Sequence, residues 1–360
     1  MKRITRREFL RLLALGAGST AAAPLLKGCA PANPAEPGMP TFTPFFPEGI
    51  LPPGAATATQ APTALASDTL PPTNTPTETA TATEPAPATA YLAVARGGND
   101  PELLVQRAVA ALGGIGRFVP AGASVVIKPN ICWAGRSYEY AATTNPWVVG
   151  ALVKMCRAAG AGRVIVLDYP FGGTSEQAYV SSGIQEQVLA AGGEMQAISM
   201  VRFVSTAIPD AVRLKTCDIY EEVLNADVLI NVPIAKDHGL ARITMGMKNL
   251  LGVVRDRPAC HSDLANCLSD LTGFLRPTLT IVDAIRILTA NGPTGGNLND
   301  VRKLDTVVAS ADPVAADCFA ASLFGLNGAE DLPYIRAAAQ RGIGRTDLEN
   351  VKVEEITVGG

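Results

Sequence analysis

Residues 124–130 read Ser-Val-Val-Ile-Lys-Pro-Asn, an apolar run that ends in a lysine, a proline and an asparagine. A short apolar run of this kind is typical of a strand buried on both faces. A helix is predicted next, because Asn145 can cap it, Pro146 suits its first turn and Gly160 can end it. A second apolar run, residues 163–168, follows directly. This stretch therefore predicts a strand, a helix and a strand, which is the repeating unit of a parallel sheet.

The same alternation continues to the end of the chain. Residues 351–358 alternate between apolar and polar, as an edge strand does, and three further apolar runs predict strands at 227–233, 279–283 and 306–310. Helical patterns predict helices at 101–112, 261–275, 312–324 and 333–341. We expect an α/β fold with a largely parallel sheet or sheets and flanking helices. About 270 residues suit two Rossmann-like lobes, which we predict, or one large sheet.

The composition excludes some classes of protein and divides the chain into three parts. The 360 residues carry a formal net charge of -3, with 48% hydrophobic and 5% aromatic residues. Such a balance gives no basic face, so nucleic acid is not an expected partner. We predict an export signal at 1–28, a tether at 29–90 and an α/β domain at 91–360.

The first part resembles a bacterial export signal. Six basic residues oppose one acid in residues 1–28, and the apolar run that follows is too short to span a bilayer. Thr-Arg-Arg-Glu-Phe-Leu at 5–10 resembles a twin-arginine signal, which implies the twin-arginine export machinery as a partner. The alternative is a chance arginine pair in an ordinary secretory signal.

A lipid anchor is predicted where the signal ends. Leu-Lys-Gly-Cys at 26–29 resembles a lipobox, so Cys29 would be lipidated and would hold the protein at the outer face of the bacterial cell membrane. The alternative is cleavage near the alanines at 21–23, which would leave Cys29 without a role. Membrane contact is expected through the lipid alone.

The second part is a stalk by composition. Residues 30–90 are rich in Pro, Thr and Ala, and they contain no Lys, Arg or Cys. They have too little apolar surface to offset the entropy of an ordered chain, so we expect a disordered, extended tether.

Polar residues collect where the predicted strands end. In open α/β sheets, ligands bind beyond the carboxyl ends of the strands, so these residues are candidate ligand contacts. They are Lys128, Asn130, Asp168, Lys236 and Asp283. A single Asp at a strand end is usual in turns, but several such ends at one edge favour a cleft.

Both histidines of the chain flank one cationic segment. His238 and His261 lie on either side of a short helical pattern, in which Lys248 is at the edge of an apolar stripe and Asn249 faces away from it. Residues 233–258 hold five basic and two acidic side chains, a local charge of +3 in a near-neutral domain. This charge predicts a small anionic ligand, a phosphate or a carboxylate. A solvated surface run is the alternative interpretation.

Roles follow from the residue types. His238 or His261 would act as general acid/base, because imidazole titrates near neutral pH. Lys128, Lys236 and Lys248 would bind or polarise the anion. Asp317 lies one turn into a helix capped by Asp312 and is a further candidate contact, with a solvated helix face as the alternative. A divalent metal on His238, His261 and Asp263 is another use of these side chains, but their spacing matches no specific metal motif. The chain has no iron–sulfur motif.

A glycine-rich loop, Asn-Gly-Pro-Thr-Gly-Gly-Asn at 291–297, follows one predicted strand. Its backbone amides could cradle an anion, and an ordinary turn is the alternative. Besides Cys29 the chain has six cysteines, and residue 156 is expected to pack in the core.

Together these segments resemble DUF362, a family of unknown function. The matching pieces run in the family's order and are found at 127–130, 143–146, 231–238, 247–252, 261, 282–283, 292–296, 310–317 and 342–344. Two positions depart from the pattern, since Asp237 stands where Thr is common and Asn145 where Asp is common. The resemblance implies an α/β fold and a site in these segments, and it implies no particular reaction.

Three functions therefore stay open at the level of sequence. The first is an envelope enzyme that acts on a small anion through His and Lys chemistry, with or without a metal. The second is a tethered protein that binds an anionic solute in the same cleft without chemistry. The third is a structural module of the envelope, for which the cleft residues would be expendable.

Overall fold

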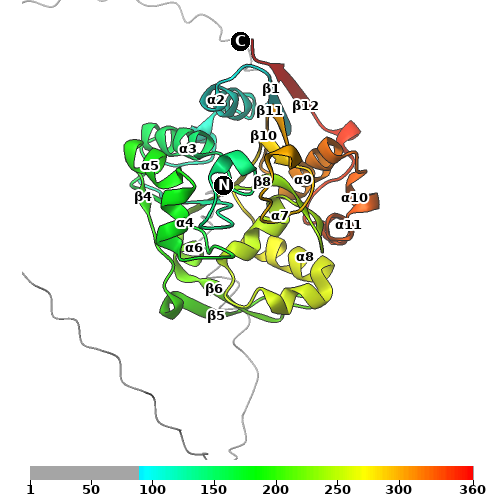
Figure 1. The fold of residues 1–360 in the computed structure, drawn as a ribbon. Coiled ribbons are helices and arrows are strands. Elements are labelled where there is room, and N and C mark those ends of the chain that lie inside the picture. Colours follow the sequence, from blue (N-terminus) through cyan, green and yellow to red (C-terminus); the bar gives the residue numbers. More distant parts are fainter. Residues whose placement is uncertain (1–88, 360) are drawn as a thin grey trace, which may run out of the picture. The chain divides into compact units, whose positions relative to one another are not determined.

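Ten strands join one sheet, which forms the centre of the domain (Figure 1). The structure is a computed structural model, and it describes residues 89–359. The predicted signal and lipidation site, and the tether up to residue 88, lie outside the described residues. The sheet order is β12-β1-β11-β10-β7-β2-β3-β4, and β8 and β9 extend it beside β10. These strands are β1 (Leu92–Arg96), β2 (Ser124–Pro129), β3 (Arg163–Val166), β4 (Glu194–Met195), β7 (Val228–Val232), β8 (Ile234–His238), β9 (Arg242–Thr244), β10 (Leu279–Leu288), β11 (Val301–Ser310) and β12 (Val353–Thr357).

The sheet is largely parallel, as predicted. Strands β2, β3, β4, β7, β8 and β10 are joined by parallel pairs, whereas β11 runs antiparallel to both β1 and β10. A separate antiparallel pair is formed by β5 (Phe203–Ala207) and β6 (Thr216–Tyr220). Because the predicted strands share one continuous sheet, the structure has the alternative of one large sheet and not the two lobes.

Helices cover both faces of the sheet (Figure 1). One face packs on α2 (Pro101–Ala111), α3 (Pro146–Ala158), α4 (Ser175–Ser181) and α5 (Ile184–Ala190). The other packs on α7 (Gly246–Asn249), α8 (Leu264–Leu275), α9 (Pro313–Ala321) and α11 (Pro333–Gln340). The remaining α-helices of the described residues are two short ones, α6 (Glu221–Asn225) and α10 (Gly328–Asp331).

Alternation along the central strands explains where their polar side chains point. Val125 and Ile127 belong to the core beneath α2 and α3, whereas Val126 belongs to the core beneath α7 and α8. Successive side chains of a strand face opposite sides, so Lys128 points toward the α7 side. Asn231 is the register partner of Lys128 on the neighbouring strand and faces the same side.

Most predicted elements are confirmed within one to four residues at each end. Asn145 caps α3 by accepting a hydrogen bond from the amide of Trp147, and Pro146 is its first residue. The chief differences are in β10 and β11, which extend beyond the predicted apolar cores because their far ends pair with each other in a hairpin. Strand β1, the β8–β9 hairpin and the β5–β6 pair were not predicted.

Candidate functional site

A cleft of about 860 Å³ opens beyond the carboxyl ends of β2, β3 and β7. Eight of the predicted site residues line it: Lys128, Asn130, Asp168, Lys236, His238, Lys248, Asn249 and His261. The structure therefore brings together the cationic and imidazole side chains that the sequence placed near one another.

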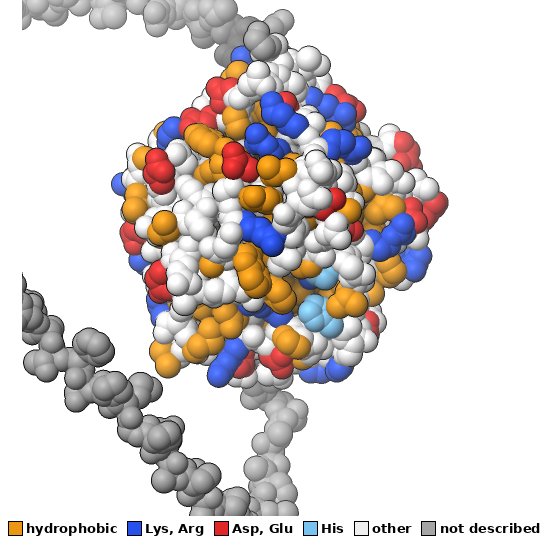
Figure 2. Space-filling view, in the orientation of Figure 1, with side chains coloured by type: hydrophobic (Ala, Val, Ile, Leu, Met, Phe, Trp, Pro, Cys, Tyr) orange, Lys and Arg blue, Asp and Glu red, His pale blue; other side chains and the backbone are white. Residues whose placement is uncertain are grey.

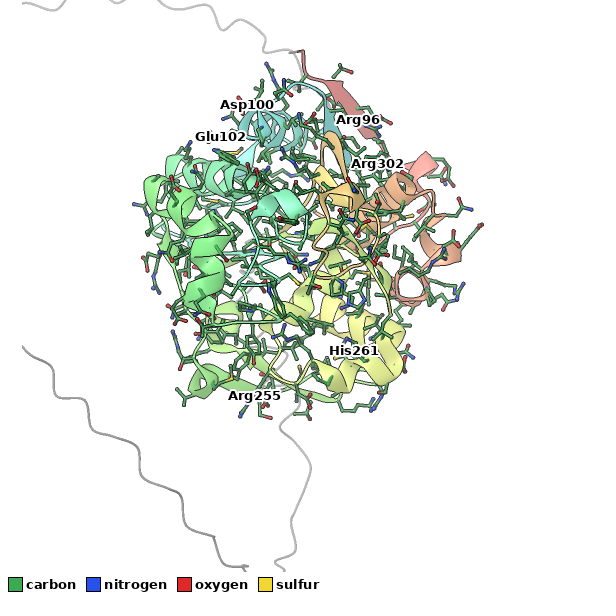
Figure 3. The ribbon with its side chains drawn as sticks, in the orientation of Figure 1. Arg96, Asp100, Glu102, Arg255, His261 and Arg302 are labelled. Carbon is green, nitrogen blue, oxygen red and sulfur yellow. The ribbon has the colours of Figure 1, made fainter. Side chains whose placement is uncertain are left out.

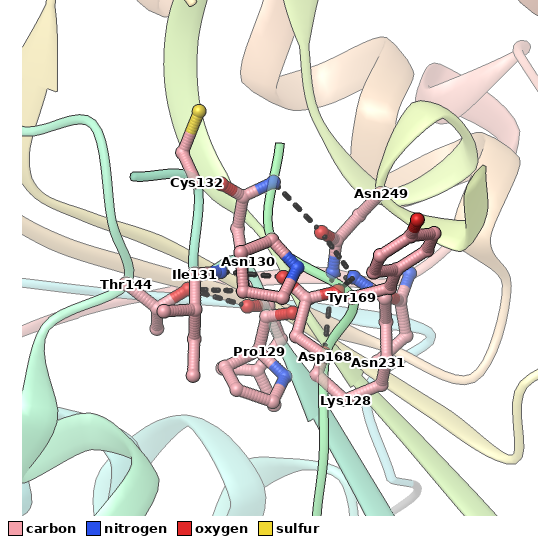
Figure 4. Close-up of polar contacts among 12 residues, drawn as sticks. Lys128, Pro129, Asn130, Ile131, Cys132, Thr144, Asp168, Tyr169, Asn231 and Asn249 are labelled. Atoms are coloured by element: carbon pink, nitrogen blue, oxygen red, sulfur yellow. Dashed lines mark hydrogen bonds and ion pairs between the residues drawn. The ribbon is translucent and has the colours of Figure 1, made fainter. Parts of the chain in front are cut away.

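An ion pair forms the floor of the cleft (Figure 4). The Nζ atom of Lys128 lies 2.7 Å from Oδ1 of Asp168, and it donates to Oδ1 of Asn249 at 2.8 Å. The other carboxylate oxygen of Asp168 accepts from the amide of Ile131 at 2.6 Å. Burial lowers the pKa of Lys128 and raises the pKa of Asp168, while each charge partly restores the other.

Asn249 holds the floor together, and it is buried although it points away from the apolar stripe of its helix. Its amide nitrogen donates to the carbonyl of Lys128 and to Oδ1 of Asn231. Its Oδ1 accepts from Asn130 as well as from Lys128. One side chain of α7 thereby fixes the ends of both β2 and β7.

Lys236 is a buried cation with neutral partners. Its ammonium donates to Oδ1 of Asn130 at 2.9 Å, to the carbonyl of Ala142 at 2.6 Å and to the carbonyl of Pro293 at 3.0 Å. These three bonds use all three protons of the ammonium, and none of them brings a negative charge. Its positive charge therefore acts on the cleft through space.

Two further cations lack a carboxylate partner. Lys248 is half-buried, and its ammonium makes no hydrogen bond or ion pair with any residue that the structure describes. Burial and the nearby charges of Lys236 and Arg257 lower its pKa to about 8. The guanidinium of Arg257 donates to the carbonyls of Tyr169 and Pro170, both at 3.0 Å, and it lies 4.0 Å from the centre of the Tyr169 ring.

The two histidines lie together but in different environments (Figure 2). In His238, Nδ1 accepts from the amides of Leu240 and Ala241, at 3.1 and 3.3 Å, so the neutral ring carries its proton on Nε2. Burial, together with Lys248, Lys236 and His261, lowers the pKa of His238 to about 3. His238 is therefore a neutral hydrogen-bond donor at neutral pH, which fits polarisation of a ligand better than general-base catalysis.

His261 is exposed on the short 3-10 segment Pro258–Asp263, directly before α8 (Figure 3). Its pKa is lowered by partial burial and by Lys248 and Arg257. No hydrogen bond fixes its ring to another described residue. Of the two imidazoles, His261 is therefore the more exposed and the one whose ring has no described hydrogen-bond partner.

Three predicted site residues do not line the cleft. Asp317 is buried and accepts from the amides of Gly246 and Met247, so it caps the start of α7. Asp283 is buried and accepts from the amides of Asn145 and Ile285. Burial raises the pKa of Asp317 to about 7 and that of Asp283 to about 6. Both carboxyl groups position the elements around the cleft instead of contacting its contents.

The third predicted site residue that lies outside the cleft is Asp263, the candidate metal ligand. Its carboxylate caps α8 by accepting from both the backbone and the side-chain nitrogen of Asn266. Within residues 89–359, no group of three His, Cys, Asp or Glu side chains is arranged to hold a metal ion. The proposed ligand set His238, His261 and Asp263 is thus not assembled in the structure.

The glycine-rich loop contacts two residues of strand β8. The amide of Gly292 donates to the carboxylate of Asp237, and the carbonyl of Pro293 accepts from Lys236. The loop thus supplies an acceptor that holds a lysine. The sequence also gave no sign of the Tyr169 stack on Arg257 or of the thiol of Cys132 in the cleft wall, because both contacts join distant segments.

The six cysteines of the domain are free thiols, and five are buried. Cys156 lies on the buried face of α3, as predicted. Within the described residues, no helix combines the length and the apolar character needed to cross a bilayer.

Comparison with known proteins gives a family and no activity. The chain is 28% identical over 247 residues to the thylakoid-associated protein sll1697 of Synechocystis, covering 66% of this chain and 74% of that relative. A lactate racemase apoprotein from Thermoanaerobacterium thermosaccharolyticum aligns in structure with a TM-score of 0.40 and 12% identity. That alignment covers 62% of this chain, and it spans about half (54%) of the racemase. The model of the family described as "Domain of unknown function (DUF362)" matches residues 125–322, which is more than half of the chain and includes every residue that lines the cleft, so the chain belongs to the DUF362 family.

Proposed function

We propose that the cleft binds a small anion, a phosphate or a carboxylate. The observation that carries this proposal is the set of three cations, Lys236, Lys248 and Arg257, that line the cleft with no carboxylate partner among the described residues. A positive field in a concave, partly desolvated site attracts anions and strengthens their hydrogen bonds.

Two side chains can contact the anion directly. Lys248 has unused protons, and His238 offers Nε2–H into the cleft because its Nδ1 is already an acceptor. Lys236 cannot contribute a proton, but its charge and that of Arg257 add to the field. The Lys128–Asp168 pair is internally neutral and maintains the shape of the floor.

Binding of inorganic phosphate and of acetate to the full-length protein, measured by isothermal titration calorimetry, tests the proposal. Lys248→Met should weaken binding about tenfold or more, since a charged hydrogen bond is lost. Lys154→Met is the matched control. Lys154 is an exposed lysine of α3 that forms an ion pair with Glu102 of α2, and it does not line the cleft. The proposal fails if neither anion binds, or if both variants bind as the wild type does.

We further propose that the bound anion undergoes proton transfer. Lys248, whose pKa is lowered to about 8, is suited to give and take a proton near neutral pH. The pKa of His261 is lowered, and its ring has no hydrogen-bond partner among the described residues, so it is suited to accept a proton. Phosphate esters and carboxylates that bind can be assayed for product. Turnover that is lost in His261→Ala while binding is retained supports an enzyme, whereas binding without turnover supports a solute receptor.

We also propose that the protein is exported and tethered to the outer face of the cell membrane. The twin-arginine pattern, the lipobox-like Cys29 and the Pro/Thr-rich stalk support this location. The relative that is described as thylakoid-associated agrees with a membrane-linked setting.

A further inference from the structure

Three large apolar side chains are exposed around the mouth of the cleft. Phe171 is 67% exposed, Leu240 71% and Met200 42%, and all three line the cleft. The ring of Phe171 also contacts that of Trp133, with their centroids 6.3 Å apart. Figure 2 shows orange hydrophobic side chains beside the two pale blue histidines.

These side chains converge from separate parts of the chain. Phe171 follows β3, Met200 begins the short 3-10 segment Met200–Arg202, and Leu240 lies in the turn between β8 and β9. Single exposed apolar residues are common on protein surfaces and need no explanation. Three from different segments at one opening form a patch, and such patches mark places where apolar material binds.

The cleft is also larger than a simple anion requires. Its volume of about 860 Å³ falls in the range of ~300–1,000 Å³ that is typical of sites for drug-sized ligands. Its inner part holds Lys248 and His238, whereas Phe171, Met200 and Leu240 are exposed at its opening, beside the exposed Arg255, Asp256 and His261. A ligand that matched both parts would have an anionic end and an apolar body.

We propose that the ligand is an amphiphilic anion, with one phosphate or carboxylate group joined to an apolar chain or ring. This inference rests on the proposed anion-binding function and specifies its ligand class. The anionic group contacts Lys248 and His238, and the apolar part covers Phe171, Met200 and Leu240.

The experiment compares matched ligands that differ only in the apolar part. Inorganic phosphate is compared with octyl phosphate, and acetate with octanoate, below their micelle concentrations and with the full-length protein. The alkyl member of each pair should bind about tenfold or more tightly, because burial of two or three methylenes supplies that factor.

Variants of the exposed apolar residues test where the alkyl chain of the ligand binds. Phe171→Ser and Leu240→Ser should each reduce binding of octyl phosphate and leave binding of inorganic phosphate unchanged. Leu189→Ser is the control, because Leu189 is 55% exposed on α5 and does not line the cleft. Since all three side chains are exposed, these changes should leave the fold intact.

The outcomes separate this inference from the proposal on which it rests. Equal affinities within each ligand pair would overturn the amphiphile and leave anion binding in place. Failure of all four ligands would overturn the anion site itself. Binding to vesicles of anionic phospholipid without binding of soluble octyl phosphate would replace the cleft ligand with a membrane surface, and so would also overturn the inference.

Discussion

Lys128 and Asp168 form an ion pair at 2.7 Å with both side chains almost wholly buried. Their removal from water is costly, and Asn249 and the amide of Ile131 offset part of that cost through hydrogen bonds. The pair joins the ends of β2 and β3, so it fixes the edge of the sheet on which the cleft is built.

Asp168→Ala should destabilise the protein by about 3–5 kcal/mol, because it leaves an uncompensated ammonium in the interior. Urea unfolding of the full-length variant measures this loss. Glu194→Ala is the control, because it breaks the exposed pair with Arg163, which should cost less than about 1 kcal/mol. Equal losses in the two variants would contradict a structural role for the buried pair.

Gly252→Ala should disturb the same pair by steric overlap. A Cβ atom at residue 252 would lie 2.5 Å from Nζ of Lys128, and it would also overlap the carboxylate of Asp168. We expect a loss of about 1–3 kcal/mol in unfolding free energy, as for other overpacked sites, together with weaker anion binding. Gly239→Ala is the matched control, because Gly239 also lines the cleft and a Cβ there meets open space. Wild-type behaviour of Gly252→Ala would show that the ion pair tolerates displacement.

His238 is given two roles, as acceptor for the amides of Leu240 and Ala241 and as donor to the anion, and a substitution can separate them. In His238→Asn, the side-chain oxygen replaces Nδ1 as acceptor for the amides of Leu240 and Ala241, but the donor directed into the cleft is lost. We expect wild-type thermal stability and about tenfold weaker anion binding, measured by calorimetry. His238→Ala should lose stability as well as binding. Unchanged affinity in His238→Asn would exclude the Nε2–H group as a ligand contact.

The sequence predicted the central elements because their signals are local. Strand β2 is an apolar run, and α3 carries its cap and first-turn proline within two residues. The residues at the strand ends followed from one rule of α/β topology, so Lys128 and Asp168 could be placed in one cleft before the structure was known.

The remaining features depend on contacts between distant residues. Strand β8 contains Lys236 and His238, and its polar side chains gave no apolar run from which a strand could be predicted. The carbonyl acceptors of Lys236 come from residues 142 and 293, and Arg257 reaches a carbonyl 88 positions away. Asp283 and Asp317 were assigned to the cleft because chemistry alone does not distinguish a carboxylate that binds a ligand from one that caps backbone amides.

Cys29→Ser should release the protein from membranes. A diacylated cysteine holds a protein at a bilayer through its buried methylenes, and the domain itself contains no described helix that could do so. Fractionation of cells followed by immunoblotting measures the distribution. Cys217→Ser, which changes a buried cysteine of β6, provides a control for the loss of a thiol. Continued membrane binding of Cys29→Ser would contradict the lipid anchor.

Anion binding should weaken as the pH rises through about 8. The pKa of Lys248 in the free cleft is about 8, below the ordinary lysine value, so its charge is present at lower pH and is lost above it. With acetate, which stays ionised throughout, affinity should be level at pH 6–7 and then fall by up to about tenfold per pH unit above 8. Lys248→Arg should retain binding and move the fall out of this range, because guanidinium stays charged. Titration calorimetry in two buffers with different ionisation enthalpies should show proton uptake on binding near pH 8.5. An unchanged pH profile in Lys248→Arg would assign the titration to another group, with the buried Lys128 as the nearest alternative.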